Sequence, residues 1–360
     1  MKTEIVQHPG KILLAEIEKK GMSQKELAIR TNVSEKHIST IINTTKDISV
    51  SFARKLEIAL GSEKGYWAEL QTKYDLAQIT FGEENGIDPQ ELEILKPLKD
   101  IISYFTKKNI MQNNCPNQQK IIQLRSILRV NNLTSIPKIT YNAAYRAQLK
   151  LSTNIDPYIL FAWQRLCEIQ TEKNILNCRF NIEKLKNSID SIKQEMFEND
   201  INNSISKLKT IFADCGIAFD VVQHFRGAPV QGFIKQIEDK KVILCLTIRG
   251  KKADRFWFSL FHEIGHLVNG DINTRFVDFE SVKSDMEAKA DIFARDTLIK
   301  PDLYKQFIKS GEYFNISSIK QFSKKANIPF WITIGRLHSD GWLDWSIFAN
   351  YIPSYSWAED

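Results

Sequence analysis

Two histidines in an apolar segment, FWFSLFHEIGHLVNG at residues 256–270, constrain the fold of this chain more than any other feature. His262 and His266 are four residues apart, so on one helix both imidazoles project to the same side, one turn apart. A buried helix would favour leucine or alanine at these positions. A lone histidine on an apolar face is usually a core or surface residue with satisfied hydrogen bonds, but the paired spacing predicts two rings that act together.

The two histidines flank Glu263 in the pattern H-E-x-x-H. This spacing suits the binding of a single Zn²⁺, and the adjacent glutamate can hold a water against the metal. By average residue usage, the pattern arises by chance in roughly one chain in a hundred of this length. The longer metzincin pattern is excluded, because Asn269 and Ile272 stand where it needs a glycine and a third histidine.

A catalytic zinc needs three protein ligands and one open position. His338 is the only histidine downstream, so a carboxylate is the better third ligand. Glu287 and Asp291 lie one turn apart on one face of a predicted helix. Glu287 would bind the metal, and Asp291 would accept a hydrogen bond from a zinc-bound histidine. Three other acidic residues compete for these roles, namely Asp278, Glu280 and Asp285.

The composition is that of an ordinary soluble globular protein, with 43% hydrophobic and 26% charged residues, and 360 residues allow two or three domains. No apolar run is long enough to cross a membrane, and the first residues lack the apolar core of a signal peptide. The five cysteines are widely spaced without a C-x-x-C, which is typical of free thiols in a reducing cytosol. We therefore expect a cytoplasmic protein with no membrane partner.

The order of segments predicts a mainly α fold with a small β-sheet, of the α+β class. Residues 1–75 contain short helices with serine N-caps and glycines at their ends. Residues 76–200 are predicted to form a helical connector. Within residues 201–360, the runs GIAFDVVQ, QGFIKQIE and KVILCLTI predict three strands, which the H-E-x-x-H helix and further helices follow.

Residues 23–43, SQKELAIRTNVSEKHISTIIN, have the proportions of a helix, a short turn and a second helix. Ser23 and Ser34 are predicted N-caps, and Glu26 would form a capping box with Ser23. The residues expected in the core are Leu27, Ala28, Val33, Ile38 and Ile41. Base contacts are predicted from the start and outer face of the second helix, at Ser34, Lys36, His37 and Thr40. Phosphate contacts are predicted from Ser23 and Gln24.

The net charge of +6 is spread unevenly. Residues 1–72 carry 11 basic and 9 acidic side chains, a weak excess for a DNA-binding module. Residues 101–150 carry basic side chains and no acid. Such a stretch indicates either an anionic partner or a solvated helical surface. Its helically spaced apolar residues, among them Ile101, Phe105 and Leu124, predict that it is folded with its basic side chains outward.

Beyond these patterns, part of the chain resembles a known family. The motif of the ImmA/IrrE metallopeptidases is similar to four elements of this sequence: HEIGH at 262–266, EAKADIFA at 287–294, Leu298 and Pro301. The resemblance spans about residues 200–345. It implies a gluzincin-like metallopeptidase domain in which Glu263 is the base and the zinc ligands are His262, His266 and Glu287. Lys300 departs from the apolar residue that is usual in this family.

Residues 7–72 resemble the HigA-like antitoxins and Xre-type repressors. The resemblance rests on the stretches HPGKILLAEIEKKGMSQKELA and ISVSFARKLEIALG. This resemblance implies a helix-turn-helix domain, with DNA as the expected partner and a homodimer on a palindrome as the expected arrangement.

Two functions are compatible with these motifs. One is a zinc endopeptidase that cleaves a repressor or antitoxin to control transcription or a stress, phage or toxin–antitoxin response, with a module that binds DNA. In this enzyme, His338 and Arg336 are candidate donors to the oxyanion. The other is an antitoxin-like transcriptional repressor, in which the peptidase fold is a sensor or a platform for a partner. The intact Glu263 favours the enzyme, since a scaffold would not need it.

Overall fold

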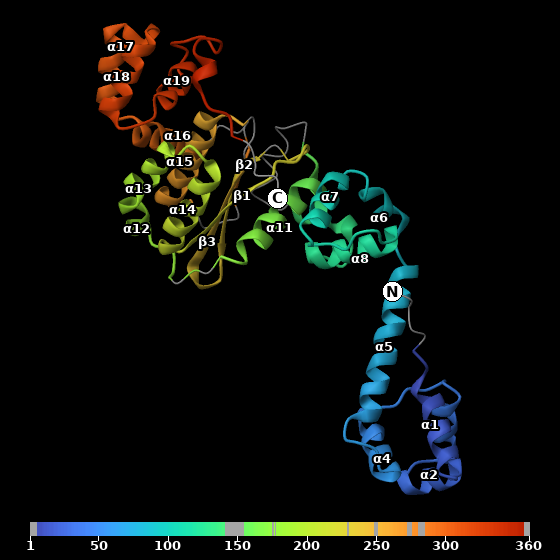
Figure 1. Ribbon diagram of the computed structural model, residues 1–360. Helices are drawn as coiled ribbons and strands as arrows, with labels where there is room; N and C mark the ends of the chain where they lie inside the picture. Colours follow the sequence, from blue (N-terminus) through green and yellow to red (C-terminus); the bar gives the residue numbers. More distant parts are fainter. Residues whose placement is uncertain are drawn as a thin grey trace. The chain divides into compact units, whose positions relative to one another are not determined.

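The computed structural model describes residues 6–140, 155–174, 176, 178–228, 230–247, 251–271, 276–279 and 285–355 (Figure 1). These residues are mainly helical with one small sheet, which confirms the predicted fold class. The chain forms two compact units. The N-terminal unit comprises Met1–Leu92 and Cys115–Ile122, and the second unit comprises Glu93–Asn114 and Gln123–Asp360. The stretch predicted as a connector therefore contributes to both units.

The N-terminal unit contains the helices α1 (Pro9–Lys19), α2 (Gln24–Thr31), α3 (Glu35–Ile42), α4 (Val50–Leu60) and α5 (Tyr66–Asn85), most of α6 (Pro89–Ile94) and the start of α8 (Asn117–Leu128). The predicted N-caps are confirmed, because Ser23 Oγ accepts from the backbone of Glu26 at 3.1 Å and Ser34 Oγ accepts from that of His37 at 3.2 Å. The Glu26 carboxylate of the predicted capping box accepts from Arg30 at 2.6 Å. Asn32, with a φ of 52°, ends α2 and sets the turn into α3.

The core of this unit holds the apolar residues that the sequence singled out. Leu27, Ile38 and Ile41 are fully buried, Ala28 is nearly so, and Val33 packs partly buried against them. A Cβ on Gly10 would lie 1.9 Å from the carbonyl oxygen of Ile41, so α1 and α3 touch backbone to backbone. This contact fixes α3 in the unit and leaves its other face outward.

The second unit contains a larger set of helices around the sheet. Its helices are α7 (Lys99–Lys107), the end of α8 (Asn117–Leu128), α9 (Ile136–Thr140), α11 (Pro157–Thr171), α12 (Ile182–Asn187), α13 (Ile189–Gln194), α14 (Ile201–Asp214), α15 (Ala253–Asn269), α16 (Asp285–Leu298), α17 (Pro301–Ser310), α18 (Ile316–Ala326) and α19 (Phe330–Ser339).

The basic stretch 101–150 is folded as predicted over its described part. Ile101, Phe105 and Leu124 are buried, and Lys107, Lys108 and Lys138 are exposed. Arg129 forms an ion pair with Glu172 at 3.3 Å. Arg146 and Lys150 lie outside the described residues.

The sheet consists of β1 (Ile217–Val222), β2 (Val230–Ile237), β3 (Lys241–Thr247) and β4 (Phe276–Phe279), in the order β1-β3-β2-β4. β3 runs parallel to β1 and antiparallel to β2, and β2 also pairs antiparallel with β4. The three predicted strands are confirmed. The fourth strand, FVDF, was not predicted, because four residues are too short to show a clear alternating pattern.

Helices cover both faces of this sheet (Figure 1). On one face, Val242, Leu244 and Leu246 of β3 enter the core that α14 and α15 share. On the other face, the thiol of Cys245 donates to the carbonyl of Cys167 in α11 at 3.9 Å. A strand covered on both sides has apolar residues throughout, which explains the continuous run VILCL.

Candidate metal centre

Helix α15 carries both histidines of the H-E-x-x-H pattern on its interior side. His262 is 6% exposed, and His266 and Glu263 are fully buried. Trp257, Leu260 and Ile264 hold the helix in the core, and Gly270, with a φ of 84°, ends it. The histidines are therefore fixed by the packing of the whole helix rather than by a loop.

Helix α16 lies against α15 and brings the third predicted ligand. A Cβ on Gly265 would lie 3.1 Å from both the Cα and the carbonyl oxygen of Ala290, so this glycine lets the two helices pack closely. As a result, Glu287 Oε2 lies 3.0 Å from His262 Nε2 and 3.5 Å from His266 Nε2. The two Nε2 atoms are 3.1 Å apart.

These three atoms have the separations that a metal site requires. Ligands at about 2.0–2.1 Å from a tetrahedral ion are about 3.3 Å from one another. The separations of 3.0, 3.1 and 3.5 Å bracket that value. His262, His266 and Glu287 thus form a buried cluster that fits a metal ion, and two imidazoles with one carboxylate are a donor set that suits zinc.

Each histidine is oriented by a second carboxylate. His262 Nδ1 lies 2.8 Å from Asp291 Oδ1, at the position that the sequence predicted. His266 Nδ1 lies 2.9 Å from Asp271 Oδ2, a partner that the sequence analysis missed. An N–H at each Nδ1 that donates to its carboxylate leaves the lone pair on Nε2, where a metal would bind. The only sequence signal for Asp271 is its place just after the helix-ending Gly270.

The charges of the cluster are strongly coupled. Burial alone would raise the pKa of Glu287, but hydrogen bonds from His262 and His266 and their charge lower it to about 2. Burial would lower the pKa of His266, but Glu287, Glu263 and Asp271 together raise it above its usual value. The cluster therefore holds Glu287 as a carboxylate and favours a proton on His266, which a bound metal would displace.

The general base predicted from the sequence, Glu263, lies against strand β2. A Cβ on Gly232 would be 1.8 Å from Glu263 Oε1 and 2.2 Å from its Cδ. Because Gly232 has no side chain, it leaves the space that the Glu263 carboxylate occupies. Gly232 also lies at a register shift in the pairing of β2 with β4. No role could be predicted for this glycine from the sequence, because nothing local links it to α15, which begins at Ala253.

The competing ligands and the candidate oxyanion donors lie elsewhere. Asp285 is exposed at the start of α16, and the side chains of Asp278 and Glu280 are outside the described residues. On α19, His338 Nε2 donates to the carbonyl of Ile347 at 2.7 Å, and Arg336 Nε donates to Asp340 at 2.7 Å. Among the described contacts, no hydrogen bond links His338 or Arg336 to the metal cluster, so their role with an oxyanion stays a prediction.

The predicted DNA-contacting side chains lie on α2 and α3 or at their N-caps. Lys36 is exposed, whereas the hydroxyl of Thr40 donates to the carbonyl of His37 at 2.9 Å and is half-buried. Burial and the nearby charges of Lys46 and Lys55 lower the pKa of His37. These two lysines, which the sequence analysis did not single out, add positive charge next to the start of α3.

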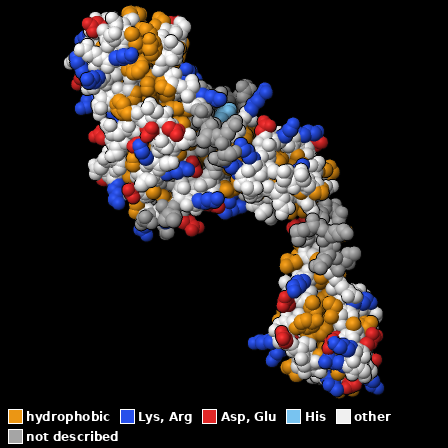
Figure 2. All heavy atoms as spheres, in the orientation of Figure 1, with side chains coloured by type: hydrophobic (Ala, Val, Ile, Leu, Met, Phe, Trp, Pro, Cys, Tyr) orange, Lys and Arg blue, Asp and Glu red, His pale blue; other side chains and the backbone are white. Residues whose placement is uncertain are grey.

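The N-terminal unit is mixed in charge on the face that Figure 2 shows. The face of the N-terminal unit seen in Figure 2 shows basic and acidic side chains interspersed, in keeping with its weak net charge. Ser23 and Ser34 use their hydroxyl oxygens as helix caps, and Gln24 at the start of α2 is half-buried.

Comparisons with known proteins bear on the N-terminal unit. Residues 13–67 match the family described as Helix-turn-helix, so this unit carries a helix-turn-helix motif of the kind found in DNA-binding regulators. The chain is also similar to Virulence-associated protein A' of Dichelobacter nodosus, with 36% identity over 73 residues. That alignment covers 20% of this chain and 64% of the relative. The resemblance of residues 200–345 to the ImmA/IrrE family stays a prediction.

No helix among the described residues is both long and apolar enough to cross a bilayer.

Proposed function

We infer that this protein is a zinc-dependent endopeptidase whose helix-turn-helix module binds DNA, and that it cleaves a regulatory protein such as a repressor or antitoxin. The convergence of His262, His266 and Glu287 with Glu263 beside them carries this proposal. When bound to these three ligands, zinc would polarise a peptide carbonyl and lower the pKa of a water molecule toward neutrality.

The protein's own residues supply the rest of the chemistry. Asp291 and Asp271 hold the two imidazoles so that Nε2 of each faces the cluster. The Glu263 carboxylate, fixed between α15 and Gly232, takes the proton of the attacking water and returns it to the leaving amine. Burial of the cluster strengthens these electrostatic interactions, because little water competes for them.

DNA binding would place this chemistry at a promoter. The exposed Lys46 and Lys55 around His37 provide a basic edge for phosphates beside the start of α3, and the exposed Lys36 would contact base edges. The second candidate function, a repressor with a non-catalytic peptidase fold, is favoured only by the helix-turn-helix match. It does not account for a buried glutamate that an opposing strand accommodates with a glycine.

The test compares two variants of the zinc-loaded full chain. Glu263→Gln should keep one zinc per chain and lose cleavage of a random peptide library by about 100-fold or more, since general acid–base catalysis contributes 10²–10⁴-fold. His262→Ala should lose the zinc. The matched control is Glu312→Gln, at an exposed position, which should change neither. If Glu263→Gln cleaves as fast as the wild type, the assignment of Glu263 as the base is wrong, and if the zinc-loaded wild type cleaves no peptide, the endopeptidase assignment is wrong.

A further inference from the structure

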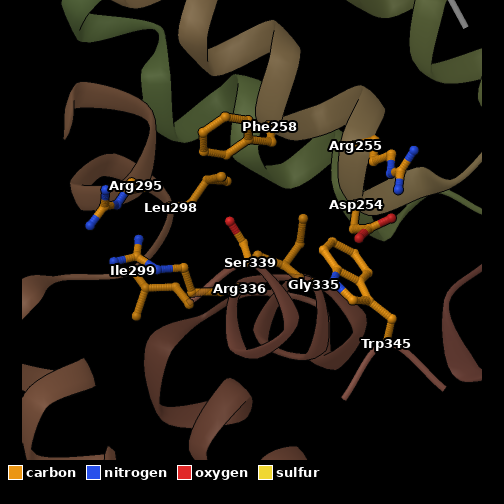
Figure 3. Close-up of a pocket in the computed structure, with 11 residues that line it drawn as sticks. Asp254, Arg255, Phe258, Arg295, Leu298, Ile299, Gly335, Arg336, Ser339 and Trp345 are labelled. Carbon is orange, nitrogen blue, oxygen red and sulfur yellow. The ribbon is translucent and has the colours of Figure 1, made fainter. Parts of the chain in front are cut away.

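A second feature of the α15–α16 pair is a cavity of about 140 Å³ (Figure 3). Phe258 and Leu298 form its walls on the side of α15 and α16, and Ile332 and Ser339 belong to α19 on the opposite side. Gly335 of α19 contributes no side chain, and a Cβ there would collide with Asp254 at 2.4 Å. The close approach of α19 to the start of α15 therefore shapes the cavity.

The size and lining of the cavity suit one apolar group. A dry cavity of roughly 150 Å³ is enough for a benzene-sized molecule. Phe258, Leu298 and Ile332 give walls that favour an apolar side chain of that size. Smaller side chains would leave part of the cavity empty and lose contacts.

The two ends of the cavity are polar. In Figure 3, Arg295 lies at one end, and Asp254, Arg255 and Trp345 lie at the other. The Arg255 guanidinium lies over the Trp345 ring, 5.6 Å from its centroid. Arg295 has no ion pair among the described residues, and its exposed guanidinium is available to a carboxylate or backbone carbonyl.

The cavity is adjacent to the metal cluster along both helices. Phe258 lies one turn before His262, and the two rings are 6.3 Å apart. Arg295 lies one turn after Asp291, which contacts His262 Nδ1. The helix faces that hold the metal ligands therefore continue directly into the walls of the cavity, whereas an unrelated ligand site would need no such continuity.

We propose that this cavity receives one large apolar side chain of the protein substrate, of leucine or phenylalanine size, and so selects which peptide bond reaches Glu263. This assignment rests on the proposed endopeptidase function. Phe258, Leu298 and Ile332 determine the preference for an apolar group, and Arg295 favours an acidic residue or a carbonyl next to it.

The test fills the cavity from its edge. Ser339 is exposed at the last position of α19, and its hydroxyl points toward Leu298 in Figure 3. Ser339→Trp should therefore occupy the cavity without disturbing a buried contact, and Ser339→Leu is a smaller version of the same change. Ser317→Trp, at an exposed position of α18 outside the cavity, is the matched control. Zinc content and circular dichroism verify the fold of each variant.

Cleavage sites of the zinc-loaded full chain in a random decapeptide library are read by mass spectrometry. The wild type and Ser317→Trp should prefer leucine, phenylalanine or methionine at one fixed position from the cleaved bond. Ser339→Trp should lose at least about 10-fold in kcat/KM for those peptides, since a mismatch of one methylene in an apolar pocket is worth 10–200-fold. Saturation-transfer NMR measures the binding of N-acetyl-phenylalaninamide. The wild type and Ser317→Trp should bind it, and Ser339→Trp should not.

The outcomes separate the two proposals. Cleavage without an apolar preference, or with a preference that Ser339→Trp leaves intact, overturns the cavity assignment while the endopeptidase function stands. Absence of cleavage in the zinc-loaded wild type overturns the endopeptidase function and the cavity assignment with it, even if N-acetyl-phenylalaninamide binds.

Discussion

Replacing Gly232 by alanine should separate catalysis from metal binding. The new Cβ would lie 1.8 Å from Glu263 Oε1, whereas ordinary contacts begin near 3.4 Å, so the carboxylate must move by about 1.6 Å. A misplacement of about 1 Å at a catalytic group can cost about 10²-fold in rate. We therefore expect kcat/KM for a library-derived peptide to fall by about 100-fold or more. Overpacking should also cost about 1–3 kcal/mol of the free energy of unfolding.

The zinc content of Gly232→Ala should stay at one per chain, because the change does not touch the three ligands. Gly82→Ala is the control, since its Cβ meets nothing within 4 Å in α5, and it should leave cleavage unchanged. In a Glu263→Gln background, Gly232→Ala should have no further effect on the rate, as a double-mutant cycle would show. Cleavage within about threefold of the wild type by zinc-loaded Gly232→Ala would refute this reasoning.

Three further predictions concern the metal cluster and the DNA-binding module. Asp271→Asn should weaken zinc binding by about 10–100-fold in a chelator competition, and the exposed Asp296→Asn should not. In the metal-free protein, the lowered pKa of Glu287 stabilises the fold above pH 4.5 by up to about 3 kcal/mol, which is lost as the pH falls toward 2. The raised pKa of His266 stabilises the fold below pH 6.5, and this contribution disappears as the pH rises through the raised value. Denaturation of the wild type and Glu287→Gln across pH 3–9 would measure how the free energy of unfolding changes with pH through both groups. Lys46→Ala should reduce the salt dependence of log Kd for an operator duplex by about one unit, and a slope equal to that of the wild type would remove Lys46 from the phosphate contacts.

The sequence determined the features that depend on local periodicity. The N-caps Ser23 and Ser34 follow from the hydrogen bonds that a helix start lacks, so their pattern is readable within four residues. The i, i+4 spacing of His262 and His266 places both rings on one side of α15, because a helical turn takes about 3.6 residues. Glu287 and Asp291 could be predicted as a pair because they share a helix face, although their approach to the histidines required a second helix.

The tertiary structure decided the features that depend on contacts between distant segments. Gly232 makes room for Glu263 from another strand, and Asp271 reaches His266 after the chain has left the helix. The cavity needs three helices to converge, and only this convergence places Arg336 in its lining and beside Asp340. Helical spacing fixes only which side of one helix a residue occupies. Which residue it contacts on another element depends on how closely the two elements approach. At Gly265 a missing Cβ lets α16 approach α15, and at Gly232 it leaves room for the Glu263 side chain.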